Sequence, residues 1–253
     1  MADLSAWSYA VAAAAAVGAG AVNSIAGGGT LISFPVLTAI GVPSVSANAT
    51  NTVALCPGYV GGTHALRQEI ADSGEPLRTR IIVAGLGGIT GALALLLTSN
   101  AAFRAVVPYL ILLSCLLLAV QDPMRRWIAG RTAGGSRLPV LELAGVYLAG
   151  TYGGYFGGGL GIMLIAVLGL FSAMPFNQLN AVKQPLAAAI NLSAAAFLVF
   201  SGKIEWGLVL VMAPASLLGG QLGGRLSRRL DPKRFRWSVI AIGVAVAVVY
   251  LVR

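Results

Sequence analysis

The sequence predicts an all-α polytopic membrane protein made of two inverted repeats of about five membrane segments each, the first of each half broken at a glycine triplet. Three observations predict this fold. Of 253 residues, 57% are hydrophobic and 10% are charged, and the mean hydropathy is +0.85. A glycine triplet occurs twice, at 27–29 and 157–159. The basic residues lie in short gaps between apolar stretches.

The composition excludes several classes of protein. Soluble domains carry about 25% charged residues, so this chain is neither a water-soluble globule nor disordered. The net charge of +9 does not indicate nucleic-acid binding, because Lys and Arg between apolar stretches are typical of membrane topology. Cys56 and Cys115 lie inside apolar stretches without metal-ligand spacing, so we expect two buried thiols, no metal site and no cofactor.

The membrane segments follow from the apolar stretches. Residues 7–40 exceed the roughly 20 residues that one spanning helix needs, and the first triplet interrupts them. Residues 139–171 behave in the same way around the second triplet. The first residues, with Asp3 and no Lys or Arg, lack the basic region of a signal peptide, so we expect them in the mature protein. The other spans are expected at 45–66, 81–98, 105–121, 176–200, 207–224 and 237–252.

The two halves of the chain align with each other. The triplets are 130 positions apart, and downstream of them the offset becomes 132. This second offset aligns Asn48 with Asn180 and Asn51 with Lys183. A tandem pattern of this length predicts two structural halves joined by a linker rich in Arg and Gly. We therefore expect a first repeat at 1–121, a cytoplasmic linker at 122–137 and a second repeat at 138–253.

Charge chooses between two topologies. If each broken stretch crosses the membrane once, each half has four spans, and the basic residues are divided almost evenly between the two sides of the membrane. If each stretch enters and returns as a hairpin at the glycines, loops 67–80, 125–137 and 225–236 share one side with thirteen basic residues, against three on the other. Cytoplasmic loops carry the Lys/Arg excess, so we expect five segments per half and both termini outside. An odd number of membrane segments per half places the second repeat in the membrane with the opposite orientation to the first.

The glycine triplets and Lys183 are the main candidates for a binding site. Non-helical backbone at membrane depth survives only when it is buried in protein or lines a wet cavity, and a helix that starts after it points its positive end there. Lys183 is the one basic residue well inside a predicted span, with no acidic residue near it in sequence. These features indicate an anion site. The alternatives are helix packing through small residues and a snorkelling lysine.

The expected substrate-binding residues are the triplet glycines and the polar residues of two spans: Gly27, Gly28, Gly29, Asn48, Thr50, Asn51, Gly157, Gly158, Gly159, Asn180, Lys183 and Gln184. His64, the single histidine, is a weak candidate for a proton relay, and an interfacial hydrogen bond is the alternative. The glycine pairs 87/91 and 219/223 have small-xxx-small spacing, which favours helix packing. No cluster of acids and no nucleophile with a base is visible, so we expect no catalytic residue.

These motifs resemble those of the TauE/SafE sulfite exporter family. The resemblance is carried by residues 23–35 with their triplet and proline, by Ala49-Thr50-Asn51, and by the second copy around 157–159; it covers nearly the whole chain. It implies an anion permease of the cell membrane that exports sulfite, organosulfonates or related sulfur-containing anions, without choosing among them. Val182-Lys183 replaces Thr50-Asn51 in the second copy, so the half-sites differ chemically.

The function expected is that of a secondary transporter rather than an enzyme. It would export a small sulfur-containing anion by alternating access, as a multi-pass protein of the cell (inner) membrane. Its expected partners are that anion and the lipid bilayer, without nucleic acid, and a homo-oligomer is compatible with the sequence. Two alternatives stay open: a transporter of another small anion or organic acid, and a membrane assembly protein that transports nothing.

Overall fold

The structure is a computed structural model and describes residues 4–252 except 26, 130–138, 173 and 227–231. The regular elements in these residues are all helices. The first half contains α1 (Ala6–Ile25), α2 (Thr30–Ala39), α3 (Ser44–Ala65), α4 (Arg67–Asp72), α5 (Leu77–Leu97) and α6 (Asn100–Ala119). The second half follows α7 (Gln121–Ala129) and contains α8 (Pro139–Tyr155), α9 (Leu160–Phe171), α10 (Phe176–Leu198), the 3₁₀ turn η1 (Val199–Ser201), α11 (Trp206–Leu226) and α12 (Pro232–Val252).

The helices are those of a multi-pass membrane protein. Among the described residues, four helices are long and apolar enough to cross a membrane: Leu77–Leu97, Asn100–Ala119, Phe176–Ser201 and Trp206–Gly223. Shorter apolar helices include α2 and α9. The span predicted at 45–66 forms α3, but Asn48, Thr50 and Asn51 interrupt its apolar character and are themselves buried. An all-helical architecture, as predicted, is confirmed for the described residues.

Helix boundaries reflect local capping signals. The side chain of Ser99 accepts a hydrogen bond from the N–H of Ala102 at 3.1 Å and so caps α6. Proline opens α8 and α12, at Pro139 and Pro232, where its missing N–H has no helical acceptor to lose. Several helices reach further into the predicted loops than expected. In α5 and α12, helical hydrogen bonds form in a charged turn that precedes the apolar stretch, and hydropathy does not detect such a turn.

The predicted loops and linker contain short helical segments. Within the linker predicted at 122–137, α7 is helical up to Ala129, and residues 130–137 lie outside the described residues. Part of the loop predicted at 67–80 is helical, in α4 and the first turn of α5. In the loop predicted at 225–236, residues 227–231 also lie outside the described part.

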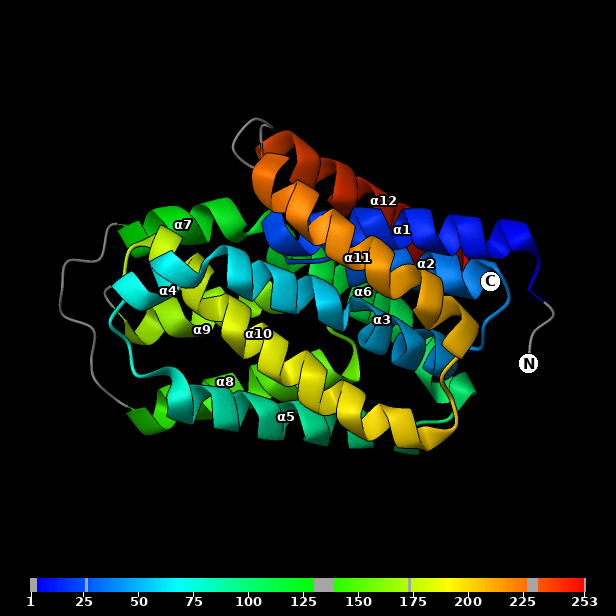
Figure 1. Ribbon diagram of the computed structural model, residues 1–253, viewed down its shortest axis with the longest axis horizontal. Helices are drawn as coiled ribbons and strands as arrows, with labels where there is room; N and C mark the ends of the chain where they lie inside the picture. Colours follow the sequence, from blue (N-terminus) through cyan, green and yellow to red (C-terminus); the bar gives the residue numbers. More distant parts are fainter. Residues whose placement is uncertain (1–3, 26, 130–138, 173, 227–231, 253) are drawn as a thin grey trace.

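Both long apolar stretches are broken where the glycine triplets occur. α1 ends at Ile25 and α2 begins at Thr30, while α8 ends at Tyr155 and α9 begins at Leu160. Gly27 and Gly157 have positive φ values of 74° and 82°, a conformation that glycine adopts at little cost. In Figure 1, α1 runs from right to left and α2 returns toward the right, so this part of the chain forms a hairpin.

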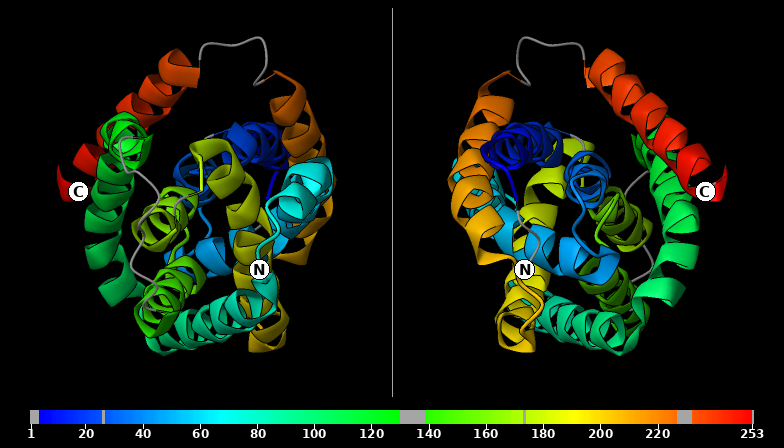
Figure 2. Two further views of the ribbon diagram at one scale, coloured as in Figure 1. Left: turned by 90° about the vertical axis from the view of Figure 1, so that its left-hand side faces the viewer. Right: turned by 90° about the vertical axis from the view of Figure 1, so that its right-hand side faces the viewer.

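The ends of the helices gather at two ends of the molecule. In Figure 1, α1 begins and α12 ends toward the right, and the connection from η1 to α11 also lies there. α4 and α7 lie toward the left. Figure 2, viewed along the horizontal axis of Figure 1, shows α2 near the middle, with α6 and α12 on one side and α11 on the other. α2, the short helix after the first glycine turn, therefore lies between longer helices.

Small residues bring α5 and α8 into contact. A Cβ atom added to Gly87 would lie 2.5 Å from the carbonyl oxygen of Tyr147, and one added to Gly91 would overlap the carbonyl oxygen of Thr151. A side chain at either position would push the helices apart. The predicted packing role of the 87/91 pair is confirmed.

The same packing recurs between α1 and α11. A Cβ atom on Gly219 would overlap the carbonyl oxygen of Val17, and one on Gly223 would lie 2.6 Å from the Cα of Ala21. Gly219 and Gly223 lie 132 residues after Gly87 and Gly91 of α5. The residues that they contact on α1, Val17 and Ala21, lie 130 residues before Tyr147 and Thr151, the contacts on α8. Each half of the chain thus packs its glycine-rich helix on the first helix of the other half.

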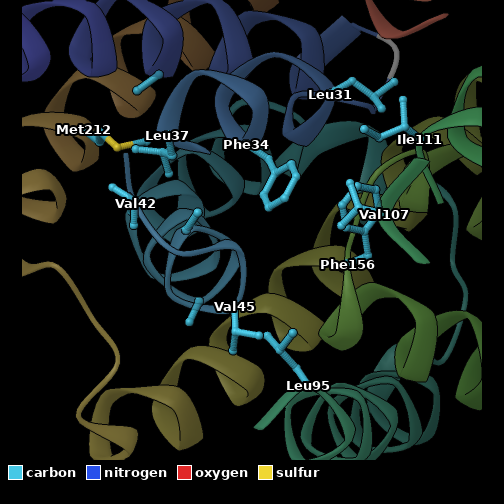
Figure 3. Close-up of a cluster of buried hydrophobic side chains, with 14 of the residues drawn as sticks. Leu31, Phe34, Leu37, Val42, Val45, Leu95, Val107, Ile111, Phe156 and Met212 are labelled. Atoms are coloured by element: carbon cyan, nitrogen blue, oxygen red, sulfur yellow. The ribbon is translucent and has the colours of Figure 1, made fainter. Parts of the chain in front are cut away.

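A buried aromatic cluster holds α2 in place. The ring of Phe34 on α2 packs edge to face on Phe103 and Phe156, with ring centroids 6.1 and 5.6 Å away. Figure 3 shows Phe34 pointing toward Phe156 and Val107, with Leu31 and Ile111 nearby. Each of these side chains is at most 2% exposed. The cluster fixes the short helix that follows the first glycine turn, and so fixes the turn itself.

Candidate functional site

The two glycine turns contact each other. A Cβ atom on Gly27 would lie 3.0 Å from the Cα of Gly161, at the start of α9. A Cβ atom on Gly157 would lie 3.7 Å from the hydroxyl oxygen of Thr30, at the start of α2. Backbone therefore meets backbone between the two halves of the chain, and glycine is required for this close approach.

Lys183 on α10 lies where these turns meet. Its Nζ atom is 3.2 Å from the position that a Cβ atom on Gly161 would occupy, and that position is also 3.2 Å from the Cα of Gly27. The side chain is 1% exposed, so its amine stays inside the protein instead of reaching the surface. Within the described part of the chain, Nζ has no hydrogen-bond partner. A buried amine without a counterion is costly and favours an anionic ligand.

Two asparagines of α3 add unpaired polar atoms. Asn48 donates a hydrogen bond from Nδ2 to the carbonyl oxygen of Tyr155, the last residue of α8, at 2.7 Å. The Oδ1 atoms of Asn48 and of Asn51, one turn further on, are buried and have no partner among the described residues. With Lys183 Nζ they are the three buried side-chain polar atoms of the described structure that lack a partner. Such atoms are rare in folded proteins, and a ligand or water bound beside them would satisfy them.

The first triplet uses two of its N–H groups internally. The N–H of Gly29 donates to Oδ1 of Asn23 at 2.8 Å, and the N–H of Gly27 donates to the carbonyl oxygen of Val22 at 2.9 Å. Both bonds close the turn between α1 and α2. These two predicted donors are thus occupied by the protein in this conformation.

The second triplet is held by a hydroxyl pair. The N–H of Gly157 donates to the carbonyl oxygen of Tyr152 at 3.3 Å. The carbonyl oxygen of Gly158 accepts hydrogen bonds from the phenol of Tyr152 at 2.6 Å and from the hydroxyl of Ser114 at 2.9 Å. These bonds point the Gly158 carbonyl toward α6, and they make Ser114 and Tyr152 positioning residues for the turn.

Other predicted site residues lie elsewhere. The hydroxyl of Thr50 accepts a hydrogen bond from the N–H of Glu205 at 3.0 Å, and so binds the chain just before α11. Gln184 is buried, with Oε1 3.5 Å from the position of a Cβ atom on Gly62 of α3. Asn180 is half-buried in the first turns of α10. None of these contacts involves the glycine turns.

His64 is separated from the buried lysine. It lies in the last turn of α3, is exposed, and its Nε2 is 2.7 Å from Nη1 of Arg67. Arg67 begins α4, at the left-hand end of Figure 1. The described contacts therefore favour an interfacial hydrogen bond over a relay that reaches Lys183.

Sequence reasoning missed several residues that shape the site. They are Asn23, Thr30, Ser114, Tyr152 and Gly161. Asn23 and Tyr152 precede the triplets by a few residues, so a search for polar groups that could close each turn would have found them. Ser114 lies in an uninterrupted apolar stretch and gives no such signal. Among the described residues, no group of three His, Cys, Asp or Glu side chains could hold a metal ion.

Comparison with known proteins supplies an independent observation. The chain matches the family described as sulfite exporter TauE/SafE over residues 12–250. It is 25% identical over 230 residues to the "Probable membrane transporter protein YfcA" of Escherichia coli strain K12, covering 90% of this chain and 84% of that protein. It is 27% identical over 237 residues to the "Probable membrane transporter protein ORF9" of Sinorhizobium sp, covering 91% and 87%. No solved structure matches it significantly.

Proposed function

Because the chain belongs to the TauE/SafE sulfite exporter family, we propose that it exports a small sulfur-containing anion, sulfite or an organosulfonate, across the cell (inner) membrane. The relatives above are named as probable membrane transporters, and the name of the family supplies the chemistry of the anion. The site residues supply the reason why an anion would bind. The proposed mechanism is secondary transport by alternating access.

The buried amine of Lys183 is the observation that carries this proposal. It lies beside Gly161, which packs against Gly27; it is 1% exposed and lacks a partner within the described residues. A sulfite or sulfonate group places several acceptor oxygens around one negative charge and can accept hydrogen bonds from Nζ. Binding would replace an uncompensated charge by a hydrogen-bonded ion pair. This gain is the free energy that would select an anion over a neutral solute.

The proposed mechanism uses two inverted halves. The α5–α8 and α1–α11 contacts repeat with the sequence offset of the two halves, and Lys183 lies where the two glycine turns meet. Transporters of this design bind substrate at the repeat interface and expose it alternately to each side. Lys183, Asn48 and Asn51 are each at most 1% exposed, as an occluded state of the proposed cycle would require.

The proposed orientation follows from charge. The end of the molecule that carries α4 and α7 holds Arg67, Arg80 and Arg126, whereas Lys203 lies near the opposite end, before α11. The positive-inside rule places the arginine-rich end in the cytoplasm. An inside-negative potential then favours exit of an anion by about 2.3 kcal/mol per charge per 100 mV. Export needs no coupled ion on this account.

Flux into proteoliposomes tests the proposed function. The purified protein is reconstituted, and the uptake of sulfite, sulfoacetate, taurine, 2-hydroxyethanesulfonate and sulfate is compared with that of protein-free vesicles. We expect at least one sulfur-containing anion to enter faster than in the protein-free control. If none of the five moves faster with the protein than without it, the proposed function is wrong.

A further inference from the structure

The polar atoms at the site do not all suit an anion. Lys183 Nζ is a donor, but the unpaired atoms of Asn48 and Asn51 are amide oxygens, which can only accept. An anion whose polar atoms are all acceptors would satisfy the lysine and leave these oxygens unpaired. Leaving a buried acceptor unpaired costs free energy in every bound state.

Asn48 cannot exchange its oxygen for its nitrogen. Its Nδ2 donates to the carbonyl oxygen of Tyr155 at 2.7 Å. Turning the amide by half a revolution would break this bond and bring two oxygen atoms together. Oδ1 of Asn48 is therefore fixed as an acceptor. No hydrogen bond among the described residues fixes the amide of Asn51 in this way, so Asn51 can turn its N–H groups toward an anion.

The acceptor and the amine border the same pair of turns. Asn48 is hydrogen-bonded to the carbonyl oxygen of Tyr155, two residues before Gly157. The amine of Lys183 lies beside Gly161, two residues after Gly159, where Gly161 packs against Gly27 of the other turn. A small ligand at this junction would meet the amine with one group and the asparagine with another.

On the basis of the proposed transport of a sulfonate, we infer that the preferred substrate is a hydroxyalkanesulfonate, whose hydroxyl donates a hydrogen bond to Oδ1 of Asn48 while its sulfonate binds Lys183. A hydroxyl fits better than an amino group, because a protonated amine would add a second buried cation beside Lys183. A site that hydrogen-bonds a substrate hydroxyl discriminates strongly against the analogue that lacks it. Asn48 is then the residue that determines this specificity.

A pair of ligands with the same shape tests this inference. The terminal hydroxyl of 2-hydroxyethanesulfonate is replaced by a methyl group in propane-1-sulfonate. Calorimetry with the purified wild-type protein should show that the hydroxylated ligand binds at least about tenfold more tightly, which corresponds to about 1.4 kcal/mol. Equal affinities, or tighter binding of propane-1-sulfonate, would overturn the inference.

Two substitutions on α3 localise the effect. Asn48→Leu removes the acceptor at similar size and should bring the two affinities to within about threefold of each other. Thr52→Val is the matched control: the Thr52 hydroxyl is buried and already donates to the Asn48 backbone carbonyl at 3.0 Å, so the wild-type preference should remain. A preference that survives in Asn48→Leu overturns the role of Asn48.

The outcomes separate this inference from the proposed function. If both sulfonates bind equally and Lys183→Met weakens both, the anion site stands and only the hydroxyl requirement fails. If neither sulfonate binds the wild-type protein, both proposals fail together. If Asn48→Leu does not fold, the wild-type ligand pair still decides the question.

Discussion

Replacing Lys183 by methionine should change affinity and stability in opposite directions. Methionine has a similar length and no charge. Without ligand, the wild-type protein keeps a buried amine that has no partner among the described residues. Apolar substitution of an uncompensated buried charge relieves its desolvation cost. We therefore expect Lys183→Met to raise the midpoint of thermal unfolding of the empty protein.

The same change should weaken the binding of a sulfonate. A hydrogen bond to a charged group contributes about 1.5–3 kcal/mol, which is about one to two decades in affinity. Lys183→Arg should recover only part of this loss. Gly161 lies beside Nζ and is itself packed against the backbone of Gly27, so a broader guanidinium meets backbone that cannot move aside.

Calorimetry and thermal unfolding of the same purified variants measure both effects. Asn51→Ala serves as the matched site variant; it removes a neutral group and should cost nearer about 1 kcal/mol of binding. A methionine variant that is less stable than wild type and binds the sulfonate equally well would refute the reasoning. Lys183 would then be part of the packing and not of the site.

Three further predictions concern the turns, the topology and one ion pair. Gly27→Ala should abolish flux, because its φ of 74° and its contact with Gly161 both oppose a side chain, whereas Gly41→Ala, with φ of 97° but open space around it, should keep flux. In whole cells, an impermeant thiol reagent should label Lys203→Cys and not Ser73→Cys; the reverse would invert the topology. Glu142→Gln should destabilise the fold by about 1 kcal/mol in thermal unfolding, because it weakens the 2.6 Å bond from Arg80 that links α5 to α8; an unchanged midpoint would contradict this role.

Much of the fold is readable from the sequence, because the signals act over long stretches. Composition and apolar length predict membrane helices, and the glycine triplets mark the places where α1 and α8 end. The exact helix ends are less readable. At Leu77 and Pro232 the helices begin several residues before the apolar stretch, since backbone hydrogen bonds do not depend on hydropathy.

The site is readable only in part. The rarity of a lysine within an apolar span makes Lys183 a candidate, and the structure places its amine beside Gly161, which packs against Gly27. Thr50 and Asn51 are neighbours in sequence, but successive residues of a helix point about 100° apart. Thr50 therefore binds the N–H of Glu205, while Asn51 keeps a buried unpaired oxygen. The rotation of α3 about its axis depends on contacts with α11 that a linear pattern does not contain.

The use of backbone groups in the turns is the least readable feature. The triplets predict exposed N–H donors, yet Asn23 occupies the N–H of Gly29, and Val22 occupies that of Gly27. These bonds depend on how the hairpin closes in three dimensions. The one sequence signal of this closure is Asn23, six residues before Gly29.

Potential-driven flux of labelled sulfite in proteoliposomes tests the central claim most directly. The variants are wild type, Lys183→Met, and Lys203→Met as the control that removes a lysine near the end of the molecule that carries η1. The account predicts that sulfite leaves wild-type vesicles faster when the interior is made negative, that Lys183→Met lowers this flux by about tenfold or more, and that Lys203→Met stays within about twofold of wild type. Equal flux through wild type and Lys183→Met would contradict the claim that an anion crosses the membrane at this lysine.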